Sequence, residues 1–145
     1  MDVYHFKLHF VNDIIYFIKS SYEYPYVMSL IRGRVNHVHS DKYKIFYHVQ
    51  PLEFTDTIEH INQYINDGTF RFIDTINKRV TDRKIHIDAK QPITSYIIAY
   101  PYLLFDIAAP LAFSNLQDAI DARKIMHLRT IDMLQSTINT LRLIN

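Results

Sequence analysis

The sequence predicts a single α+β domain with a mainly antiparallel sheet, β-hairpins, short N-terminal helices and a long C-terminal helix. Short segments of alternating or β-branched residues are separated by turn residues, which is typical of hairpins. One stretch near the C-terminus instead repeats apolar residues at helical spacing. With 145 residues, the chain has the length of one domain, residues 1–145, able to bury a core.

The N-terminal third predicts one strand followed by two short helices. Residues 3–10 alternate between apolar and polar side chains, as a half-buried strand does. Asn12 or Asp13 can cap a helix over 14–20, because their side chains accept hydrogen bonds from orphan N–H groups. A proline precedes a second apolar segment, 26–31, which we expect to be helical.

A hairpin and a short helix are expected next. Strand-like segments at 35–39 and 43–49 flank a tight-turn sequence. Asp56 followed three residues later by Glu59 has the spacing of a capping box, which predicts a helix start. The apolar stripe of this helix consists of Ile58, Ile61 and Ile65.

A second hairpin and an apolar run follow. Residues 70–80 and 84–89 are predicted to pair around a polar turn. The run 96–113 is almost entirely apolar, but two prolines and the charge of Asp106 disfavour a membrane-spanning helix. We expect a buried strand at 95–100 instead.

The final helix is the predicted interface. Ser114 with Gln117 can form its cap. Spacings of three and four residues then give one apolar seam that we expect to mediate partner docking or self-association as a homodimer. The alternative is a helix that breaks near His127 and folds back on the sheet. The seam consists of Ile131, Leu134, Ile138 and Leu141.

Composition excludes several classes of function. The chain has no cysteine, so disulfides, thiolate metal sites and cysteine nucleophiles are ruled out. It has only two glycines, which disfavours phosphate-cradling loops. The net charge of +1 gives no strong bias toward nucleic acid or membranes, and no cofactor is expected. The N-terminus has an early acid and no apolar segment, so we expect a cytoplasmic protein, or one inside a host cell if viral.

Three histidines form a candidate metal site. His37 and His39 share one face of a predicted strand. A two-residue turn would place His37 opposite Phe46 and bring His48 to the same face, giving three nitrogen ligands for a divalent metal. The His-hydrophobic-His pattern resembles the metal-binding motif of nicking and transposition nucleases, which attack DNA with a tyrosine. The alternative is a hairpin with no ligand.

An acid-lysine pattern is the candidate catalytic site. Asp88 and Lys90 end an alternating strand, and Asp74 lies fourteen residues upstream. This Asp-x-Lys pattern resembles the core of restriction-type nucleases. The resemblance implies that the acids hold a divalent metal while the lysine orients the attacking water. The alternative is a solvated hairpin edge, where lysine discourages strand aggregation.

Basic and aromatic residues of the two hairpins could bind nucleic acid by pairing with phosphates and stacking on bases. The candidate residues are Arg32, Arg34, Lys44, Tyr47, Arg79 and Arg83. Abundant aromatics and few glycines favour a different function, namely a non-enzymatic inhibitor, immunity or viral accessory-type protein that binds a macromolecular partner. A metal-dependent nuclease or nucleic-acid-binding protein remains the alternative.

Overall fold

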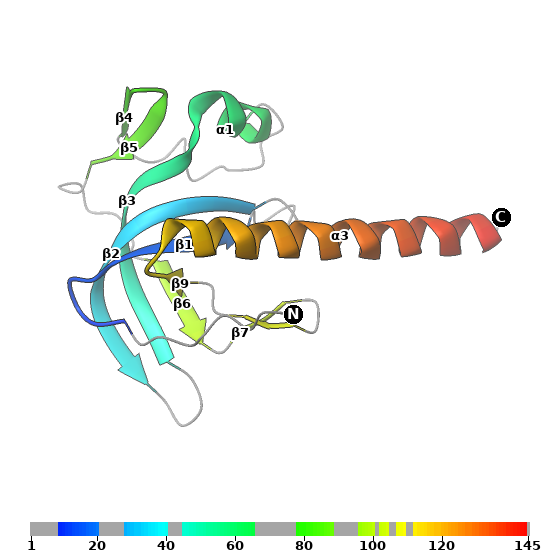
Figure 1. Ribbon diagram of the computed structural model, residues 1–145, viewed down its shortest axis with the longest axis horizontal. Helices are drawn as coiled ribbons and strands as arrows, with labels where there is room; N and C mark the ends of the chain where they lie inside the picture. Colours follow the sequence, from blue (N-terminus) through cyan, green and yellow to red (C-terminus); the bar gives the residue numbers. More distant parts are fainter. Residues whose placement is uncertain are drawn as a thin grey trace.

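The protein has an α+β fold in which one antiparallel sheet carries a long C-terminal helix (Figure 1). The computed structural model describes residues 9–20, 28–40, 45–65, 78–88, 96–100, 102–104, 107–109 and 112–144. The elements are β1 (Ile14–Ser20), β2 (Met28–Ser40), β3 (Ile45–Thr57), α1 (Ile58–Ile65), β4 (Lys78–Thr81), β5 (Lys84–Ile87), β6 (Tyr96–Tyr100), β7 (Tyr102–Leu104), β8 (Ile107–Ala109), β9 (Ala112–Phe113) and α3 (Leu116–Ile144).

The 13-residue strand β3 is central to the sheet, where it pairs with three other strands, β2, β5 and β6. The strands run in the order β4-β5-β3-β2-β1-β9, and β6 pairs with β3 as well. One end of β3 (residues 45–49) pairs with β6, whereas the other end pairs with β5. Strands β7 and β8 form a separate pair. The described sheet is antiparallel throughout, as the sequence predicted.

The two predicted N-terminal helices are wrong, because residues 14–20 form β1 and residues 28–31 begin β2. Both faces of these strands are buried. Ile15 and Phe17 belong to one hydrophobic cluster, whereas Ile18 belongs to the cluster under α3. A strand buried on both faces has a continuous apolar run, which periodicity does not distinguish from a helix. The predicted strand at 3–10 falls mostly outside the described residues.

The β2–β3 hairpin is confirmed, but its register differs from the prediction by two residues. His37 pairs with His48 and His39 with Phe46, whereas the prediction paired His37 with Phe46. A bulge between Val35 and His37 shifts the pairing so that Val35 faces Val49, both fully buried. Burial of this pair fixes the register, since a slip of one residue would turn it to the surface.

Helix α1 is confirmed, although its cap differs from the predicted one. The backbone N–H of His60 donates to Thr57 Oγ1 at 3.3 Å, so Thr57 has the role expected of Asp56. The β4–β5 turn docks on the same helix start, since Ile58 N donates to the Arg83 carbonyl at 2.7 Å. Asp82 and Arg83 both have positive φ, 52° and 64°, as a two-residue type I′ turn requires.

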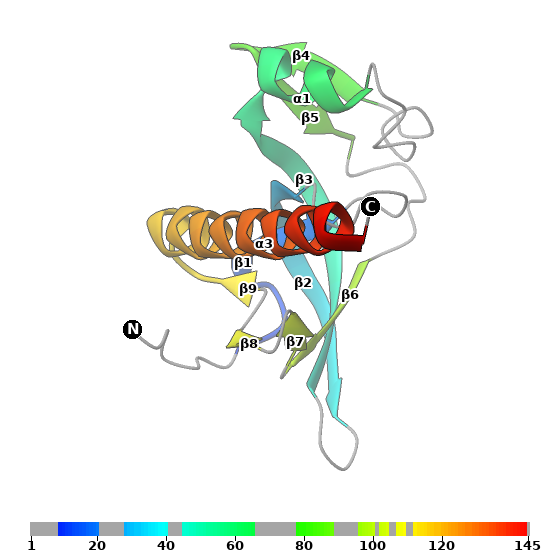
Figure 2. The same ribbon diagram turned by 90° about the vertical axis from the view of Figure 1, so that its right-hand side faces the viewer.

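The C-terminal helix α3 is continuous over 29 residues, so it does not break near His127. It crosses β1 and β2 and then extends beyond the sheet, as Figures 1 and 2 show from two directions. Asn115 rather than Ser114 caps it, with Asn115 Oδ1 accepting from Gln117 N at 2.8 Å and Asp118 N at 3.2 Å.

The apolar run is confirmed to contain a strand, β6, instead of a spanning helix. Within the described ranges, no helix has both the length and the hydropathy needed to cross a bilayer.

Candidate interaction surface

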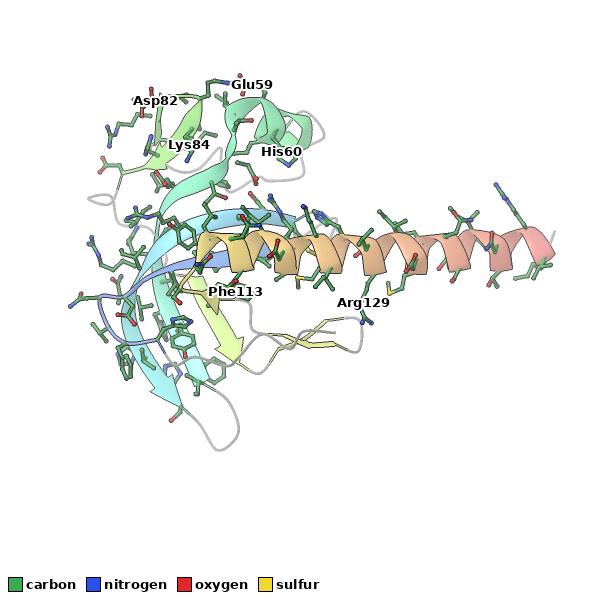
Figure 3. All side chains as sticks on the ribbon, in the orientation of Figure 1. Glu59, His60, Asp82, Lys84, Phe113 and Arg129 are labelled. Carbon is green, nitrogen blue, oxygen red and sulfur yellow. The ribbon has the colours of Figure 1, made fainter. Side chains whose placement is uncertain are left out.

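Residues 131–144 of α3, called here the distal helix, are all exposed to solvent. The buried residues of α3 are confined to its first half and consist of Ala119, Ala122, Met126 and Thr130. Fourteen residues rise about 21 Å along the axis. Figure 3 shows side chains projecting from several sides of this part of the helix, clear of the sheet.

The predicted seam lies on this distal helix. The exposed fractions are 59% for Ile131, 43% for Leu134, 43% for Ile138 and 55% for Leu141. These side chains therefore form an apolar surface (the apolar seam) that the described part of the sheet does not cover. Contiguous exposed apolar surface of this kind marks interaction sites in soluble proteins. Whether the seam is an interface stays a prediction.

An ion pair anchors α3 to the sheet. Arg123 Nη1 donates to Asp56 Oδ2 at 2.8 Å, and Nη2 donates to Oδ1 at 2.9 Å. The side chains are only 15% and 9% exposed, and Ser29 Oγ donates to the same carboxylate at 3.3 Å. A bidentate pair fixes orientation as well as distance. No local sequence pattern indicates this contact, because its partners are 67 positions apart.

His127 lies one turn beyond Arg123 on α3. Burial lowers the pKa of His127 below its ordinary value, and the positive charges of Arg123 and His60 lower it further. The carboxylate of Asp56 opposes this shift only in part. Burial and these neighbouring charges therefore favour a neutral imidazole at position 127.

The three histidines of the predicted metal site come together despite the different register. Ring centroids are 5.3 Å apart for His37 and His48, 5.6 Å for His37 and His39, and 5.0 Å for His39 and His48. His39 Nδ1 and His48 Nε2 are hydrogen-bonded at 3.2 Å. In the part of the chain that the structure describes, no group of three or more histidine or acidic side chains is arranged to hold a metal. The three rings pack against one another, and metal binding by them stays a prediction.

The predicted basic residues divide among several environments. Arg32 on β2 faces Glu53 on β3, and Glu53 faces His86 on β5, whose Nδ1 lies 3.2 Å from Glu53 Oε2. Arg79 on β4 faces His86 in turn. Directly opposed residues share a face of the sheet, so Arg32 and Arg79 end one polar row with a carboxylate between them. Sequence reasoning missed Glu53 and His86.

The other predicted binding residues do not join this row. Tyr47 is buried at 1% exposure, so its expected surface role is wrong. Arg34 is exposed on β2. Arg83 lies at the β4–β5 turn, where its Nε donates to Glu59 Oε1 at 2.9 Å. Lys44 lies outside the described residues.

The predicted nuclease triad is described at one position only. Asp88 is exposed and directly follows β5. Asp74 and Lys90 lie outside the described residues, so their convergence with Asp88 stays a prediction.

Comparisons of the chain with protein-family models, curated proteins and solved structures find no match.

Proposed function

We propose that this chain is a non-enzymatic protein-interaction module whose distal helix docks on a macromolecular partner. The observation that carries the proposal is the exposure of four large aliphatic side chains at regular helical spacing on a segment extending beyond the sheet. Small inhibitor, immunity and viral accessory-type proteins act by covering a partner's surface in this way.

The spacing of the seam fits recognition by a helix. Its residues occupy positions i, i+3, i+7 and i+10, which is the pattern of anchors that an amphipathic helix places in a groove. The helix is also prepared for binding. An isolated segment of fourteen residues is only marginally helical in water, but here the buried first half of α3 supplies the nucleus. Binding then costs less ordering of the backbone.

The charge of the distal helix favours a protein partner over nucleic acid. Between residues 131 and 144 the only ionisable side chains are Asp132 and Arg142, so the segment carries no net charge. A surface that binds phosphates needs an excess of Lys or Arg. The polar row on the sheet does contain Arg32 and Arg79, but Glu53 lies between them and reduces their attraction for phosphates.

Site-specific photo-cross-linking tests the proposal. A photoreactive amino acid replaces Leu134 in the seam or, as a matched control, Asp132 on another side of the same helix turn. In cells that express the chain naturally, we expect discrete protein adducts from position 134 and not from position 132. Equal labelling from both positions, or adducts that disappear on nuclease treatment, would contradict docking of a protein through the seam.

A further inference from the structure

The apolar seam does not continue the face by which α3 packs on its own sheet. Residues of an α-helix are about 100° apart around its axis. The buried stripe, consisting of Ala119, Ala122, Met126 and Thr130, would continue through positions 133, 137, 140 and 144. Two of these positions are threonines, whose hydroxyls donate to helix carbonyls at 3.0 Å, Thr137 to Met133 and Thr140 to Ser136. The other two, Met133 and Ile144, are apolar and exposed. The seam lies about a quarter turn away from this stripe, so it occupies a face of its own.

The residue types in the seam specify the kind of contact. Over two heptads, Ile131 and Ile138 occupy the first core position (a), and Leu134 and Leu141 occupy the second (d). β-Branched residues at a with leucine at d favour parallel two-stranded coiled coils over trimers and tetramers. We propose that a second copy of this chain covers the apolar seam, with the two distal helices forming a parallel coiled coil. This inference rests on the proposed function, of which it names the partner.

The flanking positions are compatible with self-pairing. In a parallel coiled coil, the g position of one helix lies near the e position of the next heptad on its partner. Here Thr137 would face Arg142 of the other copy, where no like charges meet. Thr130, which precedes the first core position, is buried by its own chain and takes no part in this contact. A two-fold axis along the coil brings the same seam of each chain into contact, so the assembly stops at a dimer.

The size of the seam sets the strength of the dimer. Together, the exposed fractions of the four seam residues equal about two whole side chains per copy. This surface is smaller than the roughly 1,200 Å² in total that specific, stable complexes bury, so the contact belongs to the weak and transient class. We therefore expect a weak, reversible dimer whose share increases with concentration.

Sedimentation and cross-linking test this inference on the full chain. The mass should rise from 17.3 kDa to twice that value as concentration increases. Ile138→Glu with Leu141→Glu should keep the mass at one chain, whereas Ser136→Glu with Asn139→Glu should dimerise like the wild type. Since the chain has no cysteine, a single Leu141→Cys reports the direction of the helices. It should form a disulfide-linked dimer under oxidation, and Asn139→Cys should not.

Four results would overturn the inference. These are a wild type that stays monomeric at all concentrations, equal loss of the dimer in both double variants, unfolding of the seam variant under conditions where the wild type is a monomer, and a dimer that Leu141→Cys does not cross-link. A monomeric wild type that still gives protein adducts from position 134 would remove self-pairing but leave the proposed function intact. A monomeric wild type that also gives no protein adducts from position 134 would contradict both self-pairing and the proposed function.

Discussion

Breaking the ion pair that anchors α3 should destabilise the whole fold. The variant Asp56→Ala leaves the guanidinium of Arg123, only 15% exposed, without its carboxylate. Removing one partner of a buried ion pair costs about 3–5 kcal/mol, because the other charge stays desolvated. For a chain of this size, such a loss lowers the melting temperature by about 6–20 °C. Urea titration and thermal melts measure it directly.

The double variant Asp56→Ala with Arg123→Met separates the pair from the packing around it. Because no unpaired charge remains, it should recover about 2 kcal/mol or more relative to the sum of the single changes. The matched control is the exposed pair Arg83–Glu59, with side chains 69% and 56% exposed. Removing that pair should shift the melting curve little. Equal effects at the two pairs, or additivity at Asp56 and Arg123, would refute the anchoring role.

Three further changes test the fold and the histidines. Gly33→Ala should cost about 1–3 kcal/mol in urea titration, because a Cβ there would lie 2.9 Å from the Gln50 carbonyl oxygen; an unchanged midpoint would mean that the strands separate easily. In the wild type, the pKa of His127 is lower in the folded chain than in the unfolded chain, so the unfolded chain binds the proton first as the pH drops below the ordinary value of 6.5. The free energy of unfolding therefore decreases between pH 7 and pH 5, and His127→Gln should make this decrease smaller. A pH dependence identical to the wild type's would contradict this. Zinc should raise the melting temperature, because His39 and His48 already have nitrogens 3.2 Å apart, close to the spacing of two ligands on tetrahedral zinc. His37→Ala should abolish the rise, because the ring of His37 lies against both of the others and would supply the third ligand. A melting temperature that does not change on adding zinc would contradict metal binding by the three histidines.

Local patterns predicted those elements whose structure is decided locally. The turn at Asp82 and Arg83, the start of α1 and the length of α3 all follow from residues within a few positions of one another. The caps were each misplaced by one residue, to Asp56 instead of Thr57 and to Ser114 instead of Asn115. Neighbouring polar residues compete for the same orphan N–H groups, so sequence alone does not choose between them.

The features that sequence did not predict depend on distant parts of the chain. Residues 14–20 form a strand with both faces buried, and α3 buries one of these faces. Nothing within the segment itself indicates that a distant helix packs on it. The pairing of Arg123 with Asp56 and the row through Glu53 and His86 depend on tertiary contacts in the same way. The seam was predictable in position and as an exposed interface, since its spacing is local, but the residue at which burial ends, Thr130, follows only from where the sheet ends.

The anchoring of α3 near its start makes the helix a lever. About 21 Å of helix lies beyond Thr130, the last buried residue. A tilt of about 10° at that point would move the tip by about 4 Å over this length. Small rearrangements around the Asp56–Arg123 pair would therefore be amplified at the far end of the helix, and the position of the seam in space depends on a contact between two side chains far from it.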